Sequence, residues 1–308
     1  MVYAILGDDD IRTRLPMASA IRAIRTALQE KADGTLLSPP RFSVPGGRNS
    51  LVFTVGGTTG ARKVLGFRVY GTFAEDSPDH VQLVAVYDGA TGALRGIVLG
   101  NRIGPLRTGA IGGVAMDSLA RKDARRLAVL GAGTQARTQL EAAVCVRRFD
   151  TIRAFSPDRG HREAFAREMS RVTGIAVEAV GRPREAVDEA DVVLCATTSS
   201  SPVFEADWLK PGAHVTTLSG GLRGASDIDP RVVERSAVIV TDSRAQLESF
   251  AEPSLVVGTP HAAKLEELAD VVTGRARGRV SEKDLTLFLS VGLAGTEVIV
   301  ADAALGEH

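Results

Sequence analysis

Two glycines and an alanine in the run LAVLGAGTQARTQ (127–139) have a spacing that suits a tight turn against a ligand. Gly131, Gly133 and Ala136 form the pattern G-x-G-x-x-A. Residues with little or no side chain let the backbone bend sharply and let a ligand come within contact distance. The N–H groups and positive end of a helix that follows such a turn attract an anion, for example a dinucleotide pyrophosphate. Because many glycine-rich turns bind nothing, the elements around the pattern decide its meaning.

The elements around this turn alternate between strands and helices. A short apolar strand (127–130) leads into the turn, and a helix (135–146) leaves it. Five more short runs rich in Val, Ile or Ala follow, with helices predicted between several of them, for example at 162–172 and 230–234. The five predicted strands are 151–156, 175–180, 191–196, 213–218 and 237–242. This alternation predicts an α/β fold with a Rossmann doubly wound parallel sheet, rather than a glycine-rich turn in an unrelated sheet.

Length and charge limit the class of protein. A chain of 308 residues suits two domains better than one core. Its 37 basic and 37 acidic residues balance, which argues against a nucleic-acid or membrane-surface partner. The first ten residues are acidic where a signal peptide is basic, and no apolar run approaches membrane-spanning length, so we expect a cytoplasmic protein. The five histidines are scattered without ligand-like spacing, so we expect no metal.

The first hundred residues have a different texture. A helix is expected over 17–31, because Met17, Ile21 and Leu28 fall on one face. Four strand candidates follow without intervening helices, separated by glycine pairs and an Asp-Gly turn, which is typical of an antiparallel meander. These candidates are 51–55, 63–70, 81–88 and 94–99. The sequence therefore predicts a separate N-terminal α+β domain that supplies substrate-binding groups.

A second glycine-rich run, GNRIGPLRTGAIGGV (100–114), joins the two halves. We expect Arg107 and Thr108 to open a helix that runs to about Arg121. At a helix start, the positive end and the Thr108 hydroxyl would favour an anion. The alternative is a flexible linker whose Arg107 is merely solvated, but the small residues that follow favour the functional interpretation.

Six runs of this sequence, in their order and spacing, resemble the ornithine cyclodeaminase and μ-crystallin family over nearly the whole chain. They are PPRF (39–42), LRTGA (106–110), LGAGTQARTQLEA (130–142), ATTSSSPVF (196–204), WLKPGAHV (208–215) and LFLSVGLAGTE (287–297). The resemblance implies a homodimer whose N-terminal domains share a sheet or barrel. It also implies hydride exchange between NAD(P) and a carbon that bears an amino or imino group. The implied domains are a substrate-binding and dimerisation domain (1–106, completed by 284–308) and a Rossmann dinucleotide-binding domain (107–283).

Three arginines become the substrate-binding candidates through this resemblance. In the family, an arginine after the prolines, a strand lysine and the arginine of the Arg-Thr pair hold the substrate carboxylate; Arg41, Arg68 and Arg107 occupy these places here. Arginine binds a carboxylate through two parallel hydrogen bonds from its planar guanidinium group, but it does not release its proton near neutral pH. Three arginines around one pocket would also tolerate a second carboxylate on the substrate. The alternative for Arg68 is a surface strand residue paired with Glu75 or Asp76.

The loop LSGGLRGASDID (218–229) departs from the family. Gly221 stands where deaminating members carry an aspartate that handles the substrate nitrogen, which argues against ornithine cyclodeaminase activity. Asp227 is the remaining candidate base if the loop brings it into the site, so Arg68 and Asp227 are the catalytic candidates. Reduction of a preformed imine asks less of the protein, and we predict an NAD(P)-dependent imine reductase or amino-acid dehydrogenase. The alternatives are a true ornithine cyclodeaminase, forming proline and ammonia, and a catalytically silent NADP-binding protein.

The end of the second predicted Rossmann strand indicates which cofactor binds. Sheets that prefer NAD place Asp or Glu there, whereas this chain has Ser156, with Asp158 and Arg159 close behind. A hydroxyl near a guanidinium favours the 2′-phosphate of NADP, while Asp158 would restore NAD binding if it turned inward. We therefore lean to NADP over NAD.

Further cofactor contacts are predicted at other strand ends. Thr197 and Ser219 end the fourth and fifth strands, where side chains either face the cofactor or cap the next helix. Ser290, with Gly292, matches the family's contact to the nicotinamide end. The cofactor-binding candidates are Arg107, Thr108, Gly131, Gly133, Thr134, Gln135, Ser156, Arg159, Thr197, Ser219 and Ser290.

Overall fold

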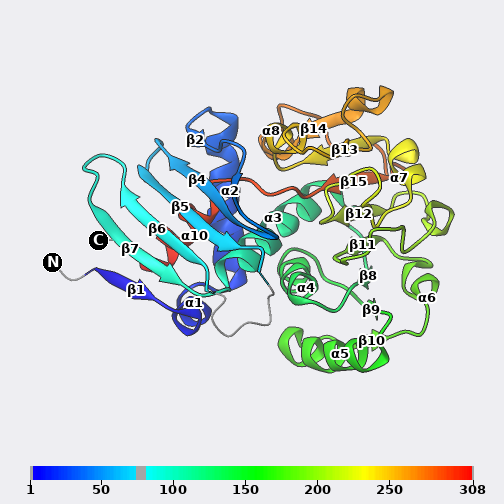
Figure 1. The fold of residues 1–308 in the computed structure, drawn as a ribbon. Coiled ribbons are helices and arrows are strands. Elements are labelled where there is room, and N and C mark those ends of the chain that lie inside the picture. Colours follow the sequence, from blue (N-terminus) through cyan, green and yellow to red (C-terminus); the bar gives the residue numbers. More distant parts are fainter. Residues whose placement is uncertain (1–2, 74–80, 307–308) are drawn as a thin grey trace. The chain divides into compact units, whose positions relative to one another are not determined.

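The computed structural model describes residues 3–73 and 81–306, and these divide into two compact units (Figure 1). The first unit is Met1–Arg107 with Gly292–His308, and the second unit is Thr108–Val291. The chain thus returns to the first unit at Gly292, later than the expected residue 284. The reason is that Thr286–Leu289 forms a strand of the second unit's sheet.

The second unit is built on an eight-stranded sheet in the order β10-β9-β8-β11-β12-β15-β13-β14. Every pairing in it is parallel, which confirms the predicted Rossmann doubly wound sheet. Six of these strands match the predicted ones, and β14 and β15 are additional. The strands are β8 (Arg126–Leu130), β9 (Thr151–Phe155), β10 (Val177–Ala179), β11 (Val192–Cys195), β12 (His214–Thr217), β13 (Val238–Thr241), β14 (Leu265–Glu267) and β15 (Thr286–Leu289).

Both faces of this sheet are buried, as a parallel sheet requires. On β8, Leu127 and Val129 join the apolar core on one face, whereas Ala128 and Leu130 join the core on the other. Helices connect the strands, as the alternating pattern predicted. They are α4 (Thr134–Val146), α5 (Arg159–Thr173), α6 (Pro183–Val187), α7 (Pro230–Arg235), α8 (Arg244–Glu248) and α9 (Leu268–Val272), with 3₁₀ turns η1 (Ala206–Trp208) and η2 (Pro260–Lys264).

A buried histidine ties two of these strands together. His214 on β12 is fully buried, with Nδ1 2.9 Å from the Thr286 hydroxyl and Nε2 3.1 Å from the Thr216 hydroxyl. Burial, with lesser contributions from Arg279 and Arg147, lowers the pKa of His214 to about 3. The imidazole is therefore neutral at physiological pH and links strands rather than titrating.

The helix α3 (Ile103–Leu119) contains the boundary between the units, and it starts earlier than predicted. Arg107 and Thr108 lie one turn inside it rather than at its start, so the predicted anion site at their helix end is wrong. Pro105 explains the earlier start, because proline fits the first helical turn, where its missing N–H has no partner to lose.

The first unit contains a seven-stranded sheet in the order β1-β7-β6-β5-β4-β2, with β3 paired to β4. Strands β4 to β7 form the predicted antiparallel meander, β3 adds to β4 as a further antiparallel strand, and β1 adds to β7 in parallel. The strands are β1 (Ala4–Leu6), β2 (Leu36–Leu37), β3 (Phe42–Gly46), β4 (Asn49–Thr58), β5 (Val64–Gly71), β6 (Leu83–Asp88) and β7 (Leu94–Leu99). The helices of this unit are α1 (Asp8–Arg14), α2 (Met17–Ala32) and α10 (Thr296–Leu305).

The two faces of this sheet differ in what covers them. Helix α10 packs on β4 to β7 and against α2 (Figure 1). It covers the face that carries Thr54 and Arg68, since Arg68 contacts Glu297 of α10. The opposite face is apolar, and many of its side chains are exposed, including Ile5 at 62%, Phe42 at 52% and Leu51 at 44%. Strand pairing places these further residues on the same face: Val44, Phe53, Val55, Leu65, Phe67, Val69, Leu83, Ala85, Tyr87, Ile97 and Leu99. We call this set the open face.

Candidate active site

The glycine-rich turn has the geometry of an anion cradle. Gly131 follows β8 with φ +109°, and a Cβ there would lie 2.2 Å from the carbonyl oxygen of Ala196, so only glycine fits. Gly133 is the N-cap of α4 and offers no side-chain cap, while the space beside its Cα is open to 4 Å. No side chain caps the first N–H groups of α4, and the space beside Gly133 is open, so this helix end suits a pyrophosphate.

The residues that follow the turn add to the cradle. Thr134 is exposed, and Gln135 has a buried side-chain oxygen with no hydrogen-bond partner among the described residues. Arg137, whose role the sequence did not reveal, donates to the carbonyl oxygen of Ala132 at 2.6 Å and to Glu168 at 2.8 Å. It thereby fastens the glycine-rich turn to α5. These contacts fit a bound dinucleotide.

The residues at the end of β9 that were expected to contact the cofactor's ribose each have a different partner in the structure. Asp158 caps α5 by accepting a hydrogen bond from the His161 N–H at 2.6 Å. Arg159 is exposed and paired with Glu163 at 2.7 Å. Arg162, one turn further along α5, donates to the carbonyl oxygens of Ser156 and Pro157, each at 3.1 Å. A second guanidinium, missed by sequence reasoning, thus lies against Ser156.

Three further candidates lie at the same edge of the sheet. Thr197, Ser219 and Ser290 follow the carboxyl ends of β11, β12 and β15, which are neighbours in a parallel sheet. Gly131 and Ser156 follow β8 and β9, so one edge carries all five. In open parallel sheets, this edge is where dinucleotides bind.

Asp227 binds threonine hydroxyl groups that follow or end two of these strands, β11 and β12. It is fully buried, and its two carboxylate oxygens accept hydrogen bonds from Thr197 at 3.1 Å and from Thr217 at 2.7 Å. The Thr217 and Ser219 hydroxyls are 2.9 Å apart. Because both Asp227 oxygens are engaged, the arrangement supports a positioning role more than the predicted role as a base. Gly221, with φ +61°, supplies no side chain in its place.

The first unit holds a cluster of charged groups, three of them buried and Arg41 half-buried, which we call the arginine cluster: Arg41, Arg68, Arg107 and Glu297. Arg68 on β5 is 6% exposed and donates to Gln82 at 3.0 and 2.5 Å and to Glu297 at 3.4 Å. Its guanidinium also lies 4.2 Å from the ring centre of Tyr70. Burial lowers the pKa of Arg68, and Glu297 partly opposes that shift. The alternative partners Glu75 and Asp76 lie outside the described residues.

Arg107 and Arg41 approach a common point in this cluster. A Cβ placed on Gly292 would lie 3.1 Å from Nη1 of Arg107 and 3.3 Å from Nη1 of Arg41. Arg107 is 7% exposed and pairs with Glu297 through Nη2 at 3.1 Å. Its Nε and Nη1 have no hydrogen-bond partner among the described residues. Buried donors are rarely left unpaired, so they point to an acceptor that a ligand would supply.

Sequence reasoning missed several members of this region because they are far apart in the chain. Glu297 on α10 is 229 residues from Arg68, and Gln82 is 14 residues from it. Thr54, the Cα partner of Arg68 across β4 and β5, has a buried hydroxyl without a hydrogen-bond partner among the described residues. The run LFLSVGLAGTE contained Glu297, but nothing local marked its role.

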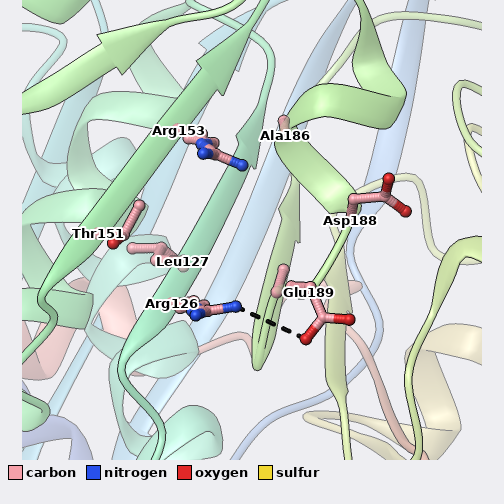
Figure 2. Close-up of a pocket in the computed structure, with 8 residues that line it drawn as sticks. Arg126, Leu127, Thr151, Arg153, Ala186, Asp188 and Glu189 are labelled. Atoms are coloured by element: carbon pink, nitrogen blue, oxygen red, sulfur yellow. Dashed lines mark ion pairs between the residues drawn. The ribbon is translucent and has the colours of Figure 1, made fainter.

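A cavity of about 330 Å³ lies elsewhere in the second unit (Figure 2). Arg126 and Thr151 in its lining begin β8 and β9, so it lies at the amino edge of the sheet, opposite the glycine-rich turn. Its charges offset one another, as the contact of 3.5 Å between Arg126 and Glu189 illustrates. Across residues 3–73 and 81–306, no cluster of three potential metal ligands occurs. Over the same residues, no helix combines the length and apolarity needed to cross a membrane.

The parallel sheet and its glycine-rich turn define a Rossmann dinucleotide-binding protein joined to an α+β unit that carries the arginine cluster. Comparison with known proteins narrows this class. The chain belongs to the ornithine cyclodeaminase/mu-crystallin family, whose model matches residues 1–304, as the resemblance predicted.

Individual relatives share most of their length with this chain. Iminosuccinate reductase from Paracoccus denitrificans is 32% identical over 262 residues, covering 81% of this chain and 79% of that protein. Δ1-pyrroline-2-carboxylate reductase from Bacillus cereus is 26% identical over 306 residues, covering 96% and 94%. The solved structure of Δ1-pyrroline-2-carboxylate reductase from Thermococcus litoralis in complex with NADH and L-proline has a TM-score of 0.88 and 29% identity, covering 98% and 96%.

Proposed function

We propose that this protein is a nicotinamide-dependent imine reductase that acts on a small 2-imino acid or, in reverse, on the matching amino acid. The observation that carries the proposal is Arg107, a buried guanidinium with two nitrogens that lack a hydrogen-bond partner among the described residues, beside Arg41. A carboxylate satisfies such a pair with short, charge-assisted hydrogen bonds. Three similar proteins support it: two are named Δ1-pyrroline-2-carboxylate reductase and one is named iminosuccinate reductase. The Thermococcus litoralis reductase is described in complex with NADH and L-proline.

The proposed roles follow the positions of the side chains. Arg41 and Arg107 hold the substrate carboxylate. Arg68 has Nε, Nη1 and Nη2 engaged by Gln82 and Glu297, which supports an indirect part, holding Glu297, beside the predicted direct contact. Arg107 and Thr108 are proposed cofactor neighbours only through the resemblance.

A bound nicotinamide would supply or accept the hydride at the imino carbon. This chain's own contribution is to fix the carboxylate and thereby the orientation of the C=N bond. Deamination of ornithine would need a base at Gly221, where there is none, and Asp227 is occupied by two threonine hydroxyls. Reduction of a preformed imine therefore fits these residues better than cyclodeamination does.

For the cofactor, we propose NADP ahead of NAD. Ser156 places a hydroxyl and no carboxylate at the end of β9, and the Asp158 carboxylate caps α5. Arg162 donates to the carbonyl oxygen of Ser156, and Arg159 follows three residues after Ser156 in the chain. A 2′-phosphate suits guanidinium groups, whereas a carboxylate there would repel it. The T. litoralis reductase is described with NADH, so both cofactors belong in the test. NADP preference fails if Arg162→Ala changes the KM for NADPH and NADH equally.

We further propose that a second copy of the chain covers the open face. This face is wide and apolar, and the residues that define it carry no charge, so it matches a copy of itself better than a charged partner. Leu65→Glu should convert a dimer to monomers in light-scattering measurements, whereas Val280→Glu, at a residue 71% exposed in the other unit, should not. A monomeric wild type would contradict the proposal. The cytoplasm is the proposed compartment, because Cys145 and Cys195 are both free thiols.

The function is tested with a substrate panel. NADPH and NADH oxidation is followed with Δ1-pyrroline-2-carboxylate, with oxaloacetate plus ammonia and with pyruvate plus ammonia, and proline formation is sought from ornithine plus NAD⁺. Arg107→Lys keeps the charge but loses the fork, so KM for the imine should rise ~10-fold or more with a smaller change in kcat. Arg95→Lys is the matched control, because Arg95 pairs with Asp302 of the same helix α10.

The outcomes separate the candidate functions. Imine turnover without ornithine turnover supports the reductase. Proline and ammonia from ornithine would favour the cyclodeaminase, and cofactor binding without any turnover would favour the silent binder. An unchanged KM in Arg107→Lys would contradict the assigned carboxylate clamp.

A further inference from the structure

Glu297 is a buried carboxylate with only one of its two oxygens in use. It lies in the first turn of α10 and is 1% exposed. Its Oε1 is shared, 3.4 Å from Nη1 of Arg68 and 3.1 Å from Nη2 of Arg107. Its Oε2 has no hydrogen-bond partner among the described residues. An unpaired carboxylate oxygen in a buried site is unfavourable, so it indicates a missing donor.

The other buried acid of the same helix provides a contrast. Asp302 is 3% exposed, and its two oxygens lie 2.9 Å from Arg62 and 3.0 Å from Arg95. Each of its oxygens therefore faces a different arginine, although only Oδ2 accepts a hydrogen bond and Oδ1 is held by the ion pair with Arg95 alone. The two acids of helix α10 thus differ, because a separate arginine faces each oxygen of Asp302, whereas Arg68 and Arg107 both pair with Oε1 of Glu297.

The open oxygen is next to open donors. Arg107 carries these donors and also contacts the carboxylate. Its Nη2 pairs with Glu297, while its Nη1 and Nε have no hydrogen-bond partner within residues 3–73 and 81–306. Nη1 of Arg41 reaches the same point beside Gly292. Arg107 therefore offers two N–H donors and, on the carboxylate with which it pairs, there is one acceptor. A ligand that complements both carries a carboxylate and, on the adjacent carbon, a protonated nitrogen.

We propose that Oε2 of Glu297 accepts a hydrogen bond from the protonated nitrogen of the substrate, the iminium of a 2-imino acid or the ammonium of the amino-acid product. The proposal rests on the reductase function and adds a specific contact to it. A protonated C=N carbon is the better hydride acceptor, and a carboxylate at hydrogen-bond distance favours that protonated form. Glu297 would then provide the contact to nitrogen that Gly221 cannot make.

The ligand pairs that test this differ only at the nitrogen. L-Proline and (S)-tetrahydrofuran-2-carboxylate share ring and carboxylate, but the second has an ether oxygen and no N–H. Alanine and lactate, and aspartate and malate, are acyclic pairs of the same kind. Dissociation constants are measured by calorimetry with and without NAD⁺, so the readout is independent of turnover. Wild type should bind the nitrogen member of at least one pair ~10-fold more tightly or better.

The variants isolate the charge of Glu297. Glu297→Gln should reduce the preference for the nitrogen ligand to within ~3-fold, with little loss of affinity for the oxygen ligand. Glu297→Asp, which withdraws the carboxylate by one methylene, should give an intermediate preference and serves if the glutamine variant does not fold. Asp302→Asn, the matched control on the same helix, should keep the full preference.

The proposal is overturned if Glu297→Gln keeps the wild-type preference, if Asp302→Asn loses it equally, or if the wild type binds neither member of any pair. Failure of the reductase function would look different. In that case no imine would be turned over, while the dependence of nitrogen preference on Glu297 would remain.

Discussion

The guanidinium of Arg68 occupies space that exists only because residue 104 is glycine. A Cβ at Gly104 would lie 2.4 Å from Nη2 and 2.9 Å from Cζ of Arg68. Arg68 is buried and held by Gln82 and Glu297, so its end cannot swing aside without losing hydrogen bonds. Gly104→Ala must therefore displace the guanidinium, or α3 must shift.

The size of the effect follows from these contacts. Losing one hydrogen bond to a charged group costs about 1.5–3 kcal/mol. Alanine recovers about 0.5–1 kcal/mol relative to glycine within a helix. Gly104→Ala should therefore destabilise the protein by about 1–2 kcal/mol. Because Glu297 then has a displaced partner, KM for the imine should also rise several-fold.

A double-mutant cycle tests this account. The free energy of unfolding in urea is measured for wild type, Gly104→Ala, Arg68→Lys and the double variant. Lysine has no planar fork to collide with the new methyl group, so the alanine should cost little or nothing in the lysine background. The two changes should couple by about 1 kcal/mol or more. Equal costs of Gly104→Ala in both backgrounds would refute the steric reasoning.

Three further predictions concern the second unit. Gly131→Ala should destabilise the second unit by about 2 kcal/mol or more and abolish dinucleotide binding, because Gly131 has a φ of +109° and its Cβ would lie 2.2 Å from the Ala196 carbonyl oxygen. Gly133→Ala, where the Cβ meets open space, should weaken dinucleotide binding without changing stability. Calorimetry measures the binding of each variant, and unfolding curves measure its stability. The pKa of His214 is about 3 in the folded protein and 6.5 in the unfolded chain, so the unfolded chain binds a proton that the folded protein does not, and stability falls as the pH drops below 6.5. His214→Asn should remove about 2 kcal/mol of the stability that the wild type loses between pH 6.5 and 5. A variant with the same pH dependence of stability as the wild type would contradict this. Asp227→Asn cannot accept from both threonines, so it should lower cofactor affinity several-fold with a measurable loss of stability; unchanged affinity would argue against the positioning role.

The fold was largely predictable because its signals are local. The turn at Gly131 and the apolar runs after it predicted the parallel sheet, and the meander followed from glycine-separated strands. Two strands of the second unit were not predicted: β14 reads LEE, with two charged residues in three, and β15 lies in a continuous apolar run that has no strand periodicity. The short strands β1, β2 and β3 of the first unit were not predicted either. The start of α3 was misplaced because Pro105 was not recognised as a first-turn residue.

The site was less predictable because its contacts join distant parts of the chain. The sequence identified Arg41, Arg68 and Arg107 through the family resemblance. It did not indicate that Arg68 is held by Gln82 and Glu297, since no pattern connects residues 229 positions apart. At the end of β9, Arg162 was overlooked because its position one turn into α5 becomes meaningful only once the helix is built.

The first unit is made from both ends of the chain, and this has a consequence for synthesis. A ribosome delivers residues 108–291, which complete the second unit, before Gly292 and α10 emerge. Until then Arg68 and Arg107 have been synthesised, but Glu297, the carboxylate with which they pair, has not. A chain cut short after Val291 would carry the whole second unit and yet lack Glu297, so the order of translation keeps the proposed substrate clamp incomplete until the final stretch is made.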